Sequence, residues 1–129
     1  MRLNIGGPSR AVFVIKSFDK CRKFYEGFLG LPIDSEWNRG PGDRGVVYEV
    51  GTTHLELLEG DHDQTDDGVY LYIPVEDVDA VWAWLASAAE VVVPIATHIW
   101  GHRNFMIRDP AGVKLKFYSP VANRLERIR

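Results

Sequence analysis

The sequence predicts an α+β protein built from two tandem βαβββ modules. Three observations predict this fold: an internal repeat with an offset of 60 residues, two segments with helical spacing of apolar residues, and short strand-like runs between turn residues. The repeat matches Phe18-Asp19 with Val78-Asp79 and holds the same register to the last strand-like run of each half. It pairs apolar residues along the way: Phe13 with Ile73, Cys21 with Val81, Tyr25 with Leu85, Ile33 with Val93, Val47 with Ile107, and Leu55 with Leu115.

The first copy begins with a strand over 11–16, which is rich in Val, Ile and Phe. Ser17 is a residue type that caps a following helix, and Asp19 lies in the first turn of that helix. The helix has one apolar face, predicted to be core, and Gly30 is a suitable end for it. Three strands are expected to follow, over 32–37, 45–50 and 53–58.

The second copy repeats this order, with a strand over 69–75 and a helix over 76–89. Strands are expected near 90–93, 104–108 and 113–118, and Asp109-Pro110-Ala111-Gly112 is a tight-turn sequence between the last two. Cys21 falls on the apolar face of the first helix, so we interpret it as core packing and not as a nucleophile.

The chain is expected to be a single domain with four parts. The first module spans about 10–59 and the second about 68–119, joined by a polar, acidic linker over 60–67 and followed by a basic tail over 120–129. The linker lacks the spacing of a known calcium loop, so it is predicted to be a solvated connection.

Composition excludes several classes of function. The net charge of −3 gives no reason to expect nucleic acid as a partner, and no apolar run approaches the length of a membrane helix. One cysteine cannot form an internal disulfide, and residues 1–10 lack the apolar stretch of a signal peptide. A cytoplasmic protein with no nucleic-acid or membrane partner is therefore predicted.

Three local motifs resemble the vicinal-oxygen-chelate superfamily, which includes glyoxalases, dioxygenases and bleomycin-resistance proteins. They are Phe24-Tyr25-Glu26-Gly27-Phe28-Leu29-Gly30-Leu31, His54-Leu55-Glu56-Leu57, and the stretch from Trp100 to Gly112, whose form is typical of bleomycin-resistance-like members. The resemblance covers about residues 10–119. It implies that the two modules form one U-shaped, cup-like mixed sheet with the helices on the convex side. It also implies a homodimer.

The resemblance implies four positions for a divalent metal, which catalytic members hold with His and Glu. Here these positions carry Arg10, Glu56, Tyr70 and Lys116, and only Glu56 is an ordinary ligand. The register of Arg10 rests on its 60-residue offset from Tyr70 and could slip to Ala11. Because a catalytic metal takes about three protein ligands, we predict no metal and no other cofactor.

Alternatives stay open around these residues. Glu56 and Lys116 can form an ion pair that replaces the metal, or Lys116 and Arg10 can bind an anionic ligand while Glu56 accepts a hydrogen bond. A displaced metal site would use His54 and Glu56, which share a strand face, with His98 and His102.

The function predicted from the sequence is metal-free binding of a neutral, anionic or aromatic small molecule, similar to bleomycin-resistance proteins. Alternatives are a metal-dependent glyoxalase-, epimerase- or dioxygenase-type enzyme with altered ligands, or a metal-free enzyme with Glu56 as the base, so whether the protein is an enzyme stays open. The cup that the resemblance implies, together with strand alternation and the loop at Trp100, gives these predicted ligand-binding residues: Arg10, His54, Glu56, Tyr70, Tyr72, Trp100, Arg103, Lys114 and Lys116.

Overall fold

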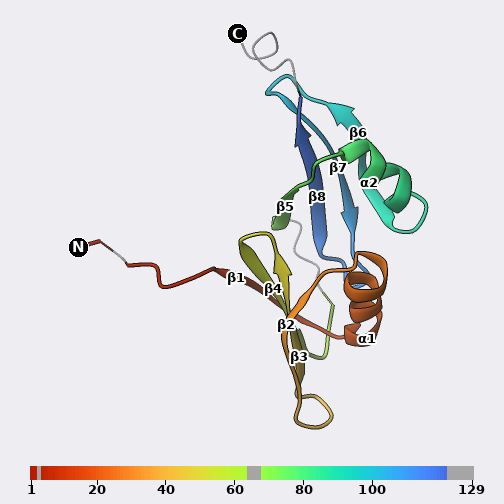
Figure 1. Cartoon of the computed structure of the whole chain (residues 1–129). Coiled ribbons are helices and arrows are strands. Elements are labelled where there is room, and N and C mark those ends of the chain that lie inside the picture. The colour runs from red at the N-terminus through yellow and green to blue at the C-terminus, as the bar shows by residue number, and fades with distance from the viewer. Residues whose placement is uncertain (3, 64–67, 122–129) are drawn as a thin grey trace. The chain divides into compact units, whose positions relative to one another are not determined.

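A computed structural model describes residues 1–2, 4–63 and 68–121 of the chain (Figure 1). The chain divides into two compact units, residues 1–64 and residues 65–129, which we call unit 1 and unit 2. Each unit has the predicted βαβββ order and a four-stranded mixed sheet, so the predicted α+β class is confirmed. The predicted linker falls partly, and the predicted tail mostly, outside the described residues.

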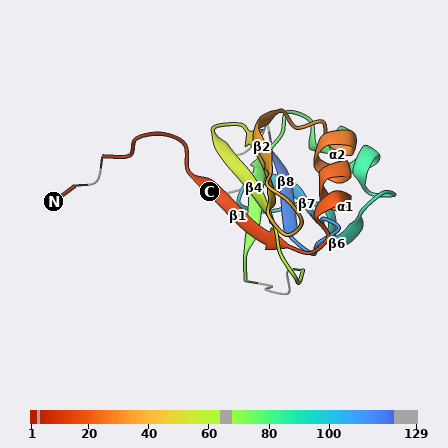
Figure 2. The ribbon, with the colours of Figure 1, turned by 90° about the horizontal axis from the view of Figure 1, so that it is seen from below.

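Unit 1 has the strand order β1-β4-β3-β2, with β1 parallel to β4 and the other pairs antiparallel. A short α-helix, α1, continues as a π-helical segment, η1, along one face of this sheet (Figure 2). The elements are β1 (Arg10–Ile15), α1 (Phe18–Arg22), η1 (Lys23–Phe28), β2 (Ile33–Asn38), β3 (Arg44–Val50) and β4 (Thr53–Glu59).

Unit 2 has the equivalent order β5-β8-β7-β6, with β5 parallel to β8. Its helix packs on one sheet face, where the Trp82 ring meets the Phe105 ring edge-on at 5.1 Å. The elements are β5 (Tyr70–Pro74), α2 (Val78–Leu85), β6 (Glu90–Thr97), β7 (His102–Arg108) and β8 (Lys114–Pro120). No helix of the described ranges is both long and apolar enough to cross a membrane.

The parallel pairs confirm the predicted repeat. Arg10 lies opposite His54 in unit 1, and Tyr70 lies opposite Lys114 in unit 2, so both strands of the pair keep the 60-residue offset. Arg10, and not Ala11, is therefore the equivalent of Tyr70. The helices also begin at equivalent residues, Phe18 and Val78.

The offset is wrong at two predicted pairs, Val47 with Ile107 and Ile33 with Val93. Ile107 lies opposite Leu115, whereas Leu55 lies opposite Tyr48, so the equivalent of Ile107 is Tyr48. Ile33 lies opposite Tyr48 and Val91 lies opposite Ile107, so the equivalent of Ile33 is Val91. For Ile107 the cause is the turn before the last strand: residues 51–52 separate β3 from β4, whereas residues 109–113 separate β7 from β8. The longer turn is fixed by the Asp109 carboxylate, which accepts from the backbone N–H groups of Ala111 and Val113 at 2.8 and 2.9 Å.

Three further expectations differ from the structure. The second helix ends at Leu85, well before the predicted end. Strand β6 runs on to Thr97, because the chain after Glu90 continues to pair with β7, through two register shifts, as far as Thr97 opposite Arg103. Ser17 precedes α1 but makes no side-chain cap. Its hydroxyl instead donates to the Asp63 carboxylate at 2.7 Å, and Asp63 also accepts from the backbone N–H groups of Lys16 and Ser17. The predicted end of the first helix is confirmed, since Gly30 has a φ of 68°.

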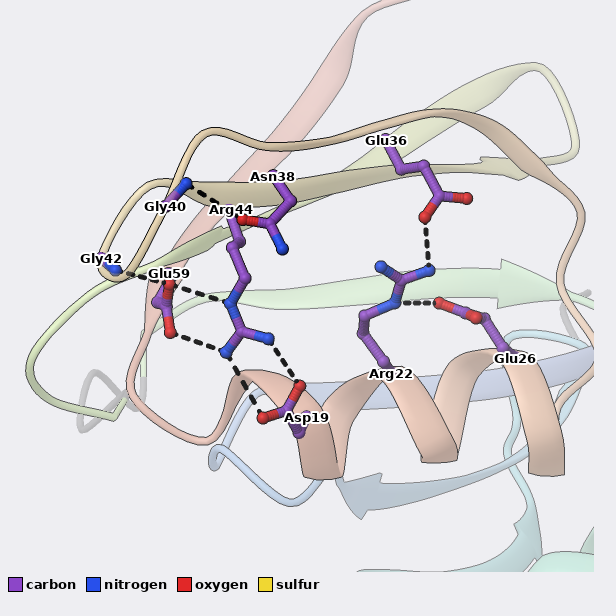
Figure 3. A network of polar contacts seen from close by, with 9 residues as sticks. All are labelled: Asp19, Arg22, Glu26, Glu36, Asn38, Gly40, Gly42, Arg44 and Glu59. Atoms are coloured by element: carbon purple, nitrogen blue, oxygen red, sulfur yellow. Dashed lines mark hydrogen bonds and ion pairs between the residues drawn. The ribbon is translucent and has the colours of Figure 1, made fainter.

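Two arginines tie α1 to the sheet of unit 1 (Figure 3). Arg44 of β3 bridges Asp19 of α1 at 2.9 Å and Glu59 of β4 at 2.7 Å. Arg22 of α1 bridges Glu26 at 2.6 Å and Glu36 of β2 at 3.1 Å. Each guanidinium therefore joins the helical segment to strands of the same sheet.

Glu26 also accepts a 2.6 Å hydrogen bond from the buried Tyr48 hydroxyl. Burial raises the pKa of Glu26, but the hydrogen bonds from Arg22 and Tyr48 lower it by more, so the pKa lies below the ordinary value of 4.5. For Asp19 and Glu59, the hydrogen bond from Arg44 is the main cause of a lowered pKa. These carboxylates stabilise the folded state above the pKa of the unfolded chain, and that stabilisation is lost as the pH falls through their folded-state pKa values.

We predict that Tyr48→Phe lowers the free energy of unfolding by about 1.5 kcal/mol at neutral pH, because it removes a buried hydrogen bond to a charged acceptor. The difference between variant and wild type should shrink as the pH falls below about 4.5, the ordinary pKa of Glu26. Urea unfolding between pH 3 and pH 7 measures both effects, with Tyr70→Phe as a control that removes the hydroxyl of an exposed tyrosine in unit 2. A constant difference across that pH range would contradict the assignment.

Candidate ligand-binding site

The strands of unit 2 place apolar side chains on one face of the sheet and aromatic and polar side chains on the other. Leu115 and Phe117 of β8 are buried on the face that carries α2, where Phe117 stacks on Phe105 at 5.4 Å. The alternate residues of β8 point to the opposite face. Strand register brings a further set of side chains to that opposite face, which we call the aromatic face: Tyr70, Tyr72, His102, Asn104, Lys116 and Tyr118.

Three rings of the aromatic face form one cluster. The Tyr118 ring stacks against Tyr72, at 4.2 Å and 13°, and against His102, at 4.4 Å and 22°, while the Tyr72 and His102 rings lie 5.7 Å apart. The Tyr72 hydroxyl is also hydrogen-bonded to Nδ1 of His102, as donor when the imidazole is neutral with its proton on Nε2. Rings fixed in this way present flat apolar surface with a polar edge, which suits a planar ligand.

Lys116 brings positive charge to the same rings. Its Nζ lies 5.6 Å from the Tyr70 ring centroid and 5.7 Å from the Tyr72 ring centroid, within the range of cation–π interaction. Tyr70 and Tyr72 are 45% and 41% exposed, so these large apolar rings remain open to solvent. The face therefore offers a cation and two accessible rings within one group of side chains.

The turn between β6 and β7 adds a second aromatic pair. His98 and Trp100 stack at 4.3 Å and 13°, and Nε2 of His98 lies 2.9 Å from Oδ1 of Asn104. The turn closes through a hydrogen bond from the Gly101 N–H to the His98 carbonyl at 3.0 Å, and Gly101 adopts a φ of 99° that favours glycine. Trp100 lies in this turn and is half exposed.

The Tyr72 hydroxyl is the point where these groups meet. Burial raises its pKa, while the Trp100 and Asn104 side chains beside it lower the pKa by smaller amounts, so the pKa stays above 10.0. Tyr72 is therefore a neutral phenol at physiological pH and can both donate and accept hydrogen bonds.

Unit 1 carries a smaller polar group on its own helix-free face. Arg10 of β1 donates to Glu56 of β4 at 2.6 Å, and Glu56 is only 8% exposed. His54 lies on the same strand face as Glu56, with Nε2 4.0 Å from a carboxylate oxygen of Asp34. The Trp37 ring packs directly on Gly45, where any Cβ would meet ring atoms at 2.1 Å.

The structure places the predicted residues as three groups. Tyr70, Tyr72 and Lys116 come together on the aromatic face, with Lys114 beside Tyr70 in register and Trp100 at the neighbouring turn. Arg10, His54 and Glu56 lie together in unit 1. Arg103 differs from both groups, since its guanidinium contacts Asp79 of α2 at 3.0 Å and Thr97 at 3.1 Å.

Sequence reasoning missed Asn104 and Tyr118 as site residues. Tyr118 could have been found by extending the alternation of Lys114 and Lys116 by two residues. Asn104 lies opposite Tyr118 across the β7–β8 pair, so it depends on the length of the turn between those strands. His98 and His102, considered for a displaced metal, have ring nitrogens hydrogen-bonded to Asn104 and Tyr72.

Comparison with known proteins identifies the family. The model of the Glyoxalase/Bleomycin resistance protein/Dioxygenase superfamily matches residues 7–117. The chain belongs to this superfamily. No curated protein sequence matches the chain significantly.

Solved structures share the fold of this chain at low sequence identity. TnmS3, an antibiotic binding protein from Streptomyces sp. CB03234, is 21% identical with a TM-score of 0.74, over 92% of this chain and 99% of its own. TioX from Micromonospora sp. ML1 is 17% identical with a TM-score of 0.71, over 90% and 100%. A superfamily member from Sphaerobacter thermophilus DSM 20745 is 19% identical with a TM-score of 0.73, over 89% and 98%.

The residues at the superfamily's metal positions do not fit a divalent cation. The Glu56 carboxylate already accepts from the Arg10 guanidinium, and the Lys116 ammonium lies over two tyrosine rings. Among the described residues, no group of three or more His, Cys, Asp or Glu side chains is placed to hold a metal ion. Arg10 and Lys116 carry positive charge and Tyr70 is a neutral phenol, so three of the four positions lack an ordinary metal ligand and oppose metal binding.

We predict that Arg10→Met lowers the free energy of unfolding by about 1 kcal/mol, because it leaves the nearly buried Glu56 carboxylate without its partner. Adding Glu56→Gln should recover part of that loss, since the amide has no charge to compensate. Urea unfolding at pH 7 of the two single variants and the double variant measures the coupling. Arg39→Met, which breaks an exposed ion pair with Asp43, is the control and should change little. Additive effects of the two substitutions would rule out the pairing.

Proposed function

We propose that this superfamily member binds a small planar aromatic molecule, neutral or anionic, without a metal, on the aromatic face of unit 2. The observation that carries the proposal is the cluster of the Tyr72, Tyr118 and His102 rings with the Lys116 ammonium 5.6 Å from the exposed Tyr70 ring. An aromatic ligand can stack on or against the open rings, where aromatic pairs contribute about 0.5–1.5 kcal/mol beyond buried area.

The charge of this side of unit 2 favours an anionic or neutral ligand. Lys114 and Lys116 extend from β8, and Arg108 lies opposite Lys114. Glu90 lies opposite Arg108, and its carboxylate is 3.4 Å from that guanidinium. The Lys116 ammonium beside the Tyr70 and Tyr72 rings attracts a carboxylate and opposes a large cation such as bleomycin.

The superfamily supports a binding function of this kind. TnmS3, which shares the fold, is an antibiotic binding protein. The alternative of a metal-free enzyme with Glu56 as the base is less well supported, because the Glu56 carboxylate is engaged by Arg10 at 2.6 Å.

The direct test is isothermal titration calorimetry with a planar anionic probe, 2-naphthoate. Lys116→Met should weaken binding about tenfold, because a charge-assisted contact to the carboxylate is lost. Tyr70→Leu should weaken binding several-fold through the loss of ring contact. Lys20→Met, which removes an exposed lysine of unit 1, is the matched control and should bind as the wild type does.

Failure of 2-naphthoate and of uncharged naphthalene-2-carboxamide to bind would refute an aromatic-ligand function. Equal affinity of the wild type and Lys116→Met for 2-naphthoate would refute the role of the lysine.

The metal-free part of the proposal has a separate test. Protein purified without a tag or chelator, then loaded with zinc, nickel, manganese and iron in turn, should retain well under one metal ion per chain in elemental analysis. The reason is the charge at the four positions, where only Glu56 is an ordinary ligand. About one ion per chain, lost in Glu56→Ala or His54→Ala, would establish a metal site and favour the enzymatic alternative.

A further inference from the structure

Asn104 carries an unmet hydrogen-bonding requirement on the aromatic face. Its side chain is 0% exposed, and among the described residues its Nδ2 is the buried side-chain atom that lacks a hydrogen-bond partner. A buried amide donor without a partner destabilises the folded state, because the loss of its hydration is not offset by a hydrogen bond. Buried polar groups in native proteins are nearly always paired, so a group left unpaired calls for a partner from outside the chain.

The free end of the carboxamide is oriented by its other end. Oδ1 of Asn104 accepts from Nε2–H of His98 at 2.9 Å, and the His98 ring is itself stacked on Trp100. With Oδ1 engaged, Nδ2 is the end of the side chain that has hydrogen-bonding capacity to spare. The hydrogen bond from His98, whose ring is held by stacking on Trp100, thus keeps Nδ2 of Asn104 in one orientation.

The surroundings of Asn104 are those of the proposed binding surface. Asn104 lies opposite Tyr118 in the β7–β8 pair, so its side chain lies on the same face of the sheet as the Tyr118 ring. Tyr72 and Tyr118 are the stacked rings against which a planar ligand would lie. A ligand on these rings would therefore have its edge beside the Asn104 amide.

We propose that Asn104 is the specificity-determining residue of this site, and that its Nδ2–H donates to a carbonyl oxygen borne on the ring system of the ligand. This inference rests on the proposed aromatic-ligand function and narrows it to planar aromatic carboxylates that also carry a ring carbonyl. Lys116 binds the carboxylate, the tyrosines bind the rings, and Asn104 selects the carbonyl.

A matched pair of probes isolates the carbonyl. 9-Fluorenone-2-carboxylate and fluorene-2-carboxylate have the same ring framework and charge, and differ only in a C=O group in place of CH₂. In the wild type, calorimetry should show the ketone binding about tenfold more tightly, because it satisfies a donor that the hydrocarbon leaves unpaired. Asn104→Leu should bring the two affinities to within about twofold of each other, whereas Lys116→Met should weaken both probes and preserve their ratio.

A second readout uses the wild type and does not depend on how the variants fold. In ¹⁵N-labelled protein, the Asn104 carboxamide resonances should shift, and their hydrogen exchange should slow, with the ketone but not with the hydrocarbon. Asn104→Asp, which lacks these resonances, serves to assign them.

The outcomes separate the two proposals. Equal binding of both probes to the wild type, with unmoved Asn104 resonances, would overturn the role of Asn104 and leave the aromatic-ligand function standing. Failure of both probes to bind would overturn the aromatic-ligand function and, with it, this inference.

Discussion

The parallel pairing of the first and last strand in each unit is the constraint on which the rest of the structure depends. A strand alternates its side chains between two faces, so one fixed register decides which residues meet the helix and which meet the opposite side. In unit 2 the pairing of Tyr72 with Lys116 sends apolar side chains toward α2 and gathers rings and charges on the aromatic face. In unit 1 the equivalent pairing brings Arg10 and Glu56 together. The same rule thus builds an aromatic group in one unit and an ionic group in the other.

Much of the fold could be predicted because the two units are copies of one pattern. The 60-residue offset holds between Arg10 and Tyr70 in the parallel strand pairs. It also holds between Phe18 and Val78, where the two helices begin. The offset fails at Val47 and Ile107 because turns change length without disturbing the strands they join. The role of Ser17 could not be predicted, because its partner Asp63 lies 46 residues away in a segment whose sequence suggests only solvation.

Part of the candidate site also followed from alternation alone. Tyr70, Tyr72 and Lys116 were predicted to share a face, and the distances from Lys116 to both rings confirm it. Asn104 could not be identified in this way. It stands out because its buried Nδ2 lacks a hydrogen-bond partner, and this can be seen only when the donors and acceptors are located in the structure. Arg103 is a residue that the sequence predicts at the ligand but the structure places elsewhere. It is a basic residue within a recognisable motif, and its guanidinium lies against Asp79 of α2.

The turn held by Asp109 also has a consequence for how this surface can change over evolution. It sets the register of β7, and a shift of one residue exchanges the two faces of a strand. A slip of β7 by one residue along β8, not absorbed by the turn, would turn Phe105 and Ile107 toward the tyrosine rings, and would carry Asn104 and Met106 to the side of α2. Point mutations can adjust a polar group here one atom at a time, but a slip in register replaces the whole chemical character of the surface at once. Relatives in which β7 has slipped by one residue against β8 are therefore expected to differ in ligand class, even where every strand residue is identical.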